Sequence, residues 1–250
     1  MSTLFNHQYC YNLLTKLSIN DNNSEQTCCI NFFPSYFCIL KNSPCFLFST
    51  GATINDVLTA CLAGAMRRYL TGSGVASPND LQIAITINTR TPASVLNGEI
   101  PLENNSAGVF FNLPVATSTL PERILETKRR MDVVKGSSEY LLFGFLFKYF
   151  MATLPEFIAR LSSHAINKCC CLVMSNVPGP LNKLVLEGNV VESVMVWPPL
   201  VSDTGISVAV FSYAGKIRVT VKADSAVISD PTVLVDNFTK EVEDLVRYCQ

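Results

Sequence analysis

The segment CCCLVMSNVPGP, residues 169–180, is an apolar run that ends abruptly at two prolines. The run Lys168–Asn176 has the length of a strand, and its continuous apolar character is typical of a strand that is covered on both faces. The prolines that follow cannot continue it, because proline has no amide hydrogen to donate to a neighbouring strand. Ser175 and Asn176 are therefore two polar side chains at the end of a predicted buried strand.

Helices and further strands are predicted on both sides of this segment. Helices are expected after a cap at Thr53, over Pro121–Val134, over Glu139–Ser163 with a break at Pro155, and from a cap and start at Asp230-Pro231. Strands are expected at Leu81–Asn88, Ala107–Val115 and Val190–Val196, and a hairpin joins Ile206–Tyr213 to Lys216–Lys222 around Ala214-Gly215. This order indicates an α/β domain with a layered mixed sheet and helices, not an alternating βαβ fold.

The length fits one large domain or one and a half ordinary ones, and the composition argues against several classes of protein. Of 250 residues, 48% are hydrophobic and only 16% are charged, which favours a large core over disorder. The net charge of −1 gives no reason to expect binding to nucleic acid. The ten cysteines show no CxxC spacing, and no basic, apolar secretory signal opens the chain. We interpret the cysteines as free thiols in a reducing, intracellular compartment.

Residues 1–50 differ from the remainder of the chain. They contain half of the cysteines and show no sustained periodicity. We interpret them either as an irregular, cysteine-rich leader or as the remnant of a missing N-terminal half. Residues 51–250 are then expected to form a single domain.

No apolar run reaches the roughly 18–20 residues needed to cross a bilayer, so no transmembrane helix is expected. The nearest is Tyr140–Leu154, which Lys148 interrupts. A buried helix is the favoured interpretation of this segment. An interfacial helix that lies in one leaflet is the alternative, because aromatic residues and a lysine suit that position.

The common catalytic motifs are absent from the sequence. It contains no GxGxxG, P-loop, GxSxG or HExxH motif. The two histidines, His7 and His164, lack the spacing of a zinc site, so no metal site is predicted. His164 is interpreted as an exposed or hydrogen-bonded helical residue and not as a general base.

Five blocks of sequence, in the same order, resemble the C-terminal region of the bifunctional wax ester synthase/diacylglycerol acyltransferase family. They are GATINDVLTACLAGAMRRYL (51–70), INTRTP (87–92), RRMDVVKGS (129–137), MSNVPGP (174–180) and GISVAVFSYAGKIRV (205–219). The resemblance covers residues 51–250. It implies one half of the chloramphenicol acetyltransferase-like fold, which nonribosomal condensation domains share. In that superfamily a substrate channel runs between two similar halves.

The resemblance implies an O-acyltransferase that moves a fatty acyl group from acyl-CoA to diacylglycerol or a long-chain alcohol, in triacylglycerol or wax ester synthesis. Acyl-CoA is then a co-substrate, no bound cofactor is expected, and lipid substrates favour peripheral contact with the cytoplasmic face of a membrane. The family's catalytic HHxxxDG motif belongs to the N-terminal half, and this sequence has no adjacent histidines. The chain alone is therefore expected to be inactive, with a histidine-bearing N-terminal half as its implied partner. A noncatalytic interaction or regulatory domain that keeps the fold is the alternative.

The same resemblance suggests four residues near the active centre. Asn55-Asp56 matches the family's Asn-Asp pair, which helps to shape the active centre, although Asp56 is favoured as a helix cap that pairs with Thr53. The role of Asn55 stays open. Ser175 or Asn176 matches the position from which superfamily relatives donate a hydrogen bond to the oxyanion. Both side chains could instead bind the following turn, and the two interpretations stay open.

Overall fold

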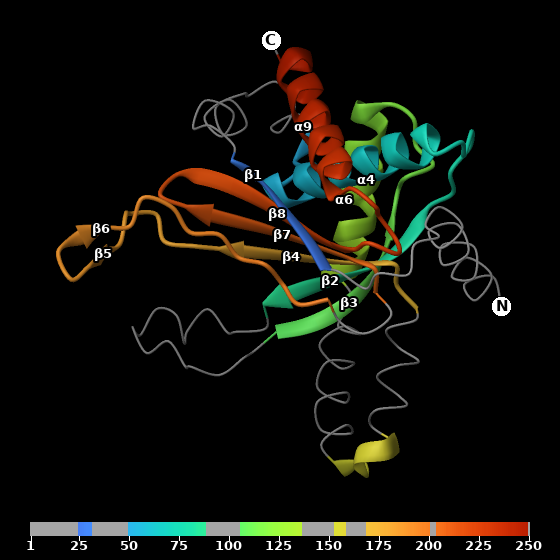
Figure 1. Ribbon diagram of the computed structural model, residues 1–250. Coiled ribbons are helices and arrows are strands. Elements are labelled where there is room, and N and C mark those ends of the chain that lie inside the picture. Colours follow the sequence, from blue (N-terminus) through green and yellow to red (C-terminus); the bar gives the residue numbers. More distant parts are fainter. Residues whose placement is uncertain are drawn as a thin grey trace.

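The computed structural model describes residues 25–31, 50–88, 106–136, 153–158, 169–200 and 204–249. At its centre is a six-stranded sheet with the strand order β1-β8-β7-β4-β2-β3 (Figure 1). The strands of this sheet are β1 (Glu25–Asn31), β2 (Leu81–Asn88), β3 (Ser106–Leu113), β4 (Leu172–Pro178), β7 (Ile206–Tyr213) and β8 (Lys216–Asp224). The helices are α4 (Ile54–Gly72), α6 (Leu120–Gly136) and α9 (Pro231–Tyr248). The predicted α/β fold with a layered mixed sheet is confirmed.

Strand β4 lies in the middle of the sheet and is parallel to both of its neighbours, β2 and β7. The other pairs, β2 with β3, β7 with β8 and β8 with β1, are antiparallel. In this register Ser175 lies between Thr86 of β2 and Ala209 of β7, and Asn176 lies beside Val210. The apolar run of the opening segment is thus the central strand of the domain.

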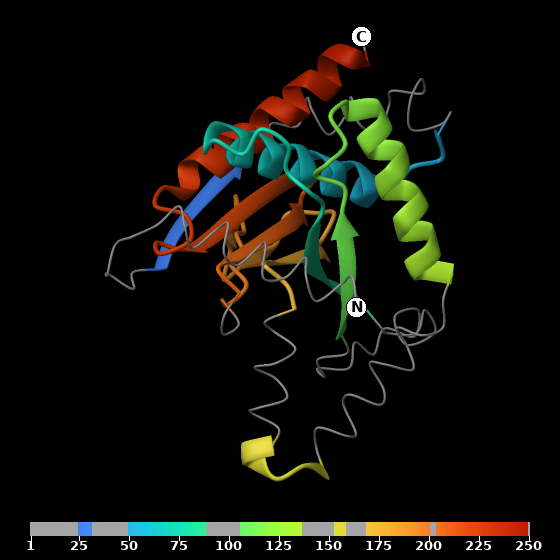
Figure 2. The same cartoon turned by 90° about the vertical axis from the view of Figure 1, so that its right-hand side faces the viewer.

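All three helices cover the same face of the sheet, as the two views in Figures 1 and 2 show. Helix α4 lies between α6 and α9 and is buried over most of its length. Its small residues Ala60, Ala63 and Gly64 allow this close packing. Beneath it, Leu172 and Met174 of β4 join the core.

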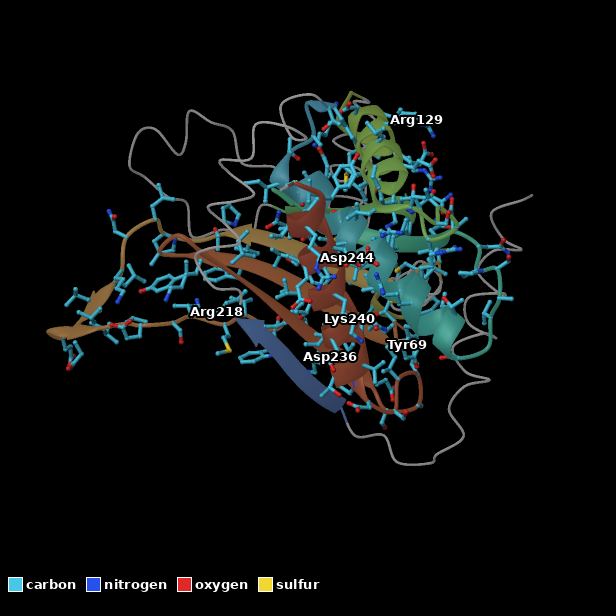
Figure 3. All side chains as sticks on the ribbon, turned by 90° about the horizontal axis from the view of Figure 1, so that it is seen from above. Tyr69, Arg129, Arg218, Asp236, Lys240 and Asp244 are labelled. Carbon is cyan, nitrogen blue, oxygen red and sulfur yellow. The ribbon has the colours of Figure 1, made fainter. Side chains whose placement is uncertain are left out.

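A buried ion pair joins the three helices. Arg123 of α6, whose side chain is 2% exposed, binds Glu241 of α9 and donates from Nε to the carbonyl oxygen of Ala60 in α4 at 3.1 Å. Gly64 is required at this crossing, because a Cβ there would overlap the Glu241 carboxylate. Arg68 of α4 also binds Glu241, at 2.6 Å, and reaches Asp244 on the outer side of α9 (Figure 3). The polar contact therefore links all three helices at their crossing.

On the opposite face of the sheet, the segment 191–200 lies across β7 and β8. Ser207 donates to the carbonyl oxygen of Pro198 at 3.1 Å, and Thr220 donates to that of Val196. Residues of β8 that alternate toward this face, such as Arg218 and Thr220, are buried as a result. The predicted strand Val190–Val196 is wrong: β6 (Asn189–Val190) contains only its first residue, and the rest covers the sheet without joining a ladder.

Two expectations for the central strand also need correction. The strand begins at Leu172 and not at Lys168, and it ends at Pro178. It is not covered on both faces: Leu172 and Met174 are buried, but Val173 and Ser175 on the other face are only half-buried. The segment 191–200 reaches β7 and β8, whereas the described residues leave the face of β2 and β4 partly open. We call this part of the sheet the open face.

Most of the other elements follow the predictions. The hairpin of β7 and β8, the strand β2 and the capped starts of α4 and α9 are confirmed. The bounds of β3, α6 and β8 differ from the predictions by one or two residues. Strand β1, which pairs with β8, lies in a region where no element was predicted. Residues 137–152 and 159–168 lie outside the described ranges. The predictions for His164, for most of Glu139–Ser163 and for most of Tyr140–Leu154 concern these residues. None of the helices in the described ranges has the length and apolarity to cross a membrane.

Candidate functional site

The polar side chains at the end of β4 point to opposite faces of the sheet. Successive residues of a strand alternate between its faces. Asn176 lies beside Val210, which belongs to the core under the helices. Ser175 lies beside Thr86 on the open face. Ser175 and Asn176 are adjacent in sequence but lie on opposite faces of the sheet.

On the helix face, Asn176 binds Asn55 at the start of α4. Its Nδ2 donates to Asn55 Oδ1 at 2.8 Å. The backbone oxygen of Asn55 accepts a second hydrogen bond from Thr59 Oγ1, also at 2.8 Å. Both asparagines were candidates from sequence, and the structure joins them across 121 positions of the chain. The contact ties the end of the central strand to the first turn of the central helix.

Asp56 caps the start of α4, which is the role that the sequence analysis favoured. Its Oδ2 accepts from the Thr53 amide at 2.8 Å, and its own amide donates to Thr53 Oγ1 at 3.3 Å, which completes a capping box. The remaining oxygen lies 3.3 Å from Lys135 Nζ. Asp56 is 1% exposed, so its carboxylate is buried among these partners. The predicted capping role is confirmed.

On the open face, Ser175 forms a hydroxyl pair with Thr86 of β2. Thr86 Oγ1 donates to Ser175 Oγ at 2.9 Å, and both side chains are half-buried. In this arrangement the hydroxyl hydrogen of Ser175 can still donate to another acceptor. A hydroxyl that accepts one hydrogen bond is also a stronger donor in the next, because the bonds polarise each other. Thr86 was not a candidate from sequence, since only the register of β2 against β4 brings it there.

The turn after β4 is held by its own contacts. The amide of Gly179 donates to Ser212 Oγ at 3.1 Å, and the carbonyl oxygen of Pro180 accepts from the Ala214 amide at 2.9 Å. Glycine is needed at 179 because a Cβ there would overlap the backbone oxygen of Ser212. The hydrogen bonds of Ser175 and Asn176 described above go to Thr86 and Asn55.

Two buried cysteines, Cys61 and Cys170, have raised pKa values. Cys61, Cys170 and Cys171 are buried, and Cys61 is a free thiol, as predicted. Burial raises the pKa of Cys61 to about 12, with a further contribution from Glu241, and burial raises that of Cys170 to about 11. A thiol with so high a pKa is a poor nucleophile at neutral pH. Within the described ranges, no three His, Cys, Asp or Glu side chains come together as metal ligands.

Comparison with known proteins identifies the family of this chain. The sequence profile of the WS/DGAT C-terminal domain matches residues 102–246. The chain belongs to this family. The match includes the central strand, the hairpin of β7 and β8, and the turn that follows β4.

Two curated WS/DGAT relatives show how much of the family's length this chain contains. A Mycobacterium tuberculosis protein, provisionally named a diacylglycerol O-acyltransferase, is 27% identical over 208 residues, covering 79% of this chain and 39% of the relative. Wax ester synthase/diacylglycerol acyltransferase 10 of Arabidopsis thaliana is 24% identical over 223 residues, covering 76% of this chain and 44% of the relative. The chain thus spans about two fifths of the length of these relatives.

Solved structures support the WS/DGAT fold. The wax ester synthase/diacylglycerol acyltransferase of Marinobacter aquaeolei VT8 superposes with a TM-score of 0.60 at 15% identity, covering 99% of this chain and 57% of the solved one. The first condensation domain of the CDA synthetase superposes with a TM-score of 0.55 at 15% identity, covering 97% and 50%. The fold implied by the sequence resemblance is confirmed by these neighbours.

Proposed function

We propose that this chain is the C-terminal half of an O-acyltransferase that moves a fatty acyl group from acyl-CoA to diacylglycerol or a long-chain alcohol. Its partner in the reaction is a histidine-bearing N-terminal half of the same family. Membership of the family supports the reaction class. The observation that carries the assignment is the hydroxyl pair of Ser175 and Thr86, which lies on the open face of the central strand.

In the proposed reaction Ser175 stabilises the oxyanion. The acceptor hydroxyl attacks the thioester carbonyl, its proton passes to a histidine of the other half, and coenzyme A leaves as the thiol. Negative charge develops on the carbonyl oxygen during the attack. A hydroxyl that is held at a strand end is a preorganised donor for that charge. Thr86 acts as a positioning residue, because its hydrogen bond orients the Ser175 hydroxyl.

Asn176 and Asn55 have a supporting role in this proposal. Their hydrogen bond lies on the helix face, away from the Ser175 hydroxyl. It holds the end of β4 against α4 and thereby fixes the position of Ser175. The open face is proposed to line the channel, and lipid substrates would bring the assembled enzyme into peripheral contact with a membrane.

The proposal is tested by reconstitution. The purified chain alone is expected to show no acyl-CoA-dependent ester formation, because the sequence contains no adjacent histidines. Mixed with the N-terminal part of the Mycobacterium tuberculosis relative, it is expected to show turnover. Ser175→Ala should then lower kcat by about 10²–10³ with little change in KM. Thr86→Val should lower kcat less, and Thr86→Ser should restore it.

Asn176→Ala is the matched control, since it removes a polar group from the adjacent position but from the other face. It should lower stability, and it should lower kcat per folded molecule much less than Ser175→Ala does, because the Ser175 hydroxyl is still present. Normal turnover by Ser175→Ala would contradict the oxyanion role. Binding between the two halves without turnover would favour the noncatalytic interaction domain. That alternative is kept because the chain lacks the histidine motif.

A further inference from the structure

One block of the sequence resemblance, RRMDVVKGS (129–137), has no part in the reaction proposed above. Its residues up to Gly136 form the end of α6. Arg130 in this block fastens α6 to the sheet, because it binds Asp80, which directly precedes β2, at 2.8 Å. Lys135, in the last turn of α6, instead contacts the start of α4. The block thus connects α6 with two other parts of the domain.

Lys135 and Asp56 form an ion pair in which only one partner is exposed. Lys135 Nζ lies 3.3 Å from Asp56 Oδ1, and the side chains of the two residues are 46% and 1% exposed, respectively. The other oxygen of Asp56 is already used, since Oδ2 accepts from the Thr53 amide. A buried carboxylate is unfavourable unless its charge is compensated. Lys135 supplies that compensation together with the amide groups at the N-terminus of α4.

A continuous chain of contacts leads from Lys135 to the end of β4. Asp56, the partner of Lys135, completes the capping box that sets where α4 begins. Asn55 precedes Asp56 in the same turn, and its side-chain oxygen accepts from Asn176 of β4 at 2.8 Å. Asn176 directly follows Ser175, whose hydroxyl is the proposed oxyanion donor. A displacement at the cap would therefore reach the proposed site through one hydrogen bond.

We infer that Lys135 is a positioning residue for the proposed reaction. Its charge holds Asp56 in the cap, and the cap places Asn55 where it can bind Asn176. Without the ammonium group, the buried carboxylate has to turn toward water, and the first turn of α4 loosens. This inference rests on the proposed function for the reaction itself. It extends that function to α6, which contributes no other residue to the site.

The Lys135 pair differs from the ordinary ion pairs on α6. Lys128 binds Asp132, and Arg129 binds Glu126, each within the helix. Exposed pairs of this kind contribute little to stability. The Lys135 pair joins two helices, and its acidic partner is buried. Removing Lys135 should therefore have an effect that removing Arg129 does not.

The first measurement needs no turnover. In two-dimensional proton–nitrogen NMR spectra of the full chain, the side-chain amide signals of Asn176 are assigned by their loss in Asn176→Ala. Lys135→Met should shift these signals, because the acceptor Asn55 is displaced. Lys135→Arg keeps the charge and should leave them near their original positions. Arg129→Met is the matched control, since it removes a basic residue of the same block whose ion pair stays within α6.

The second measurement is turnover in the mixture with the N-terminal part of the Mycobacterium tuberculosis relative. Lys135→Met should lower kcat about fivefold with little change in KM, because a small displacement of a group that acts on the transition state lowers the rate. Lys135→Arg should restore most of the rate, and Arg129→Met should not change it. In the Asn176→Ala background, Lys135→Met should have little further effect on kcat, because the contact through which it acts is already lost.

Thermal melts establish that each variant is folded before rates are compared, and Arg123 and Arg130 hold α6 in place independently of Lys135. Unchanged Asn176 signals in Lys135→Met would overturn the inference. So would an equal loss of rate in Arg129→Met, or independent effects of Lys135→Met and Asn176→Ala on kcat. Absence of turnover with the unmodified chain would sink the proposed function, while shifted Asn176 signals would still support the link from Lys135 to β4. Normal turnover by Lys135→Met would remove the positioning role and leave the proposed function standing.

Discussion

The hydrogen bond between Asn176 and Asn55 should make these two residues energetically coupled. The perturbation is the pair of substitutions Asn55→Ala and Asn176→Ala, made singly and together. The donor and acceptor are 2.8 Å apart and both side chains are half-buried, so water can partly replace the lost partner. A hydrogen bond in such a site contributes about 0.5–1.5 kcal/mol.

Each single substitution should therefore lower the free energy of unfolding by about 1 kcal/mol, equivalent to a Tm decrease of about 2–4 °C in a domain of this size. The double variant should lose much less than the sum, because both substitutions remove the same bond. The coupling energy should be about 1 kcal/mol. The capping box at Thr53 is separate and should remain intact in all variants.

Urea unfolding followed by tryptophan fluorescence provides the measurement. Trp197 is the single tryptophan and lies in the segment that crosses β7 and β8, so its emission reports on the sheet. Circular dichroism of the helices should give coincident transitions if unfolding is two-state. As a control, Asn55→Ala and Thr86→Val should be additive, since these residues share no partner. Coupling below about 0.3 kcal/mol between the two asparagines would refute the bond and its role in placing β4.

Three further results are expected. Glu241→Gln should lower the free energy of unfolding by about 3–5 kcal/mol in urea titrations, because it leaves Arg123 charged and buried without its partner. Hydrogen bonds, first from Arg129, lower the pKa of Glu126 from 4.5 to about 2. The stability advantage over Glu126→Gln should thus be present above pH 4.5 and disappear as the pH falls through about 2, with a size below about 1 kcal/mol because the pair is exposed. Cys61 should resist alkylation at pH 8 in the folded chain and react in urea, as mass spectrometry of tryptic peptides would show; labelling of the folded thiol would contradict its pKa of about 12.

Features that depend on near neighbours in the chain were predictable. The capping box of Thr53 and Asp56 spans four residues, and the turn at Ala214-Gly215 joins strands with alternating apolar side chains. Both depend on local dihedral angles and on adjacent side chains, which a sequence shows directly. The mixed layered fold followed from the order of such elements.

The features that the sequence did not predict correctly also share a physical cause. Val190–Val196 has the apolar character of a strand, but its residues cover β7 and β8 through side-chain hydrogen bonds to their carbonyl groups. The sequence around Glu241 on α9 gives no sign of its burial, because its partner Arg123 lies 118 positions away. Secondary-structure propensity does not show whether an apolar segment joins a sheet or covers it, or whether a charged helical residue is exposed or buried. The packing of the other elements decides both.

From the sequence alone it was possible to derive the α/β class, the resemblance to the acyltransferase family, and Asn55, Asp56, Ser175 and Asn176 as the residues to examine. Only the tertiary structure separated Ser175 from Asn176, because strand register sends adjacent side chains to opposite faces. It also supplied Thr86 as the neighbour of Ser175 and Asn55 as the partner of Asn176. Contacts between residues about a hundred positions apart depend on how strands are ordered in the sheet, and local side-chain chemistry does not encode that order.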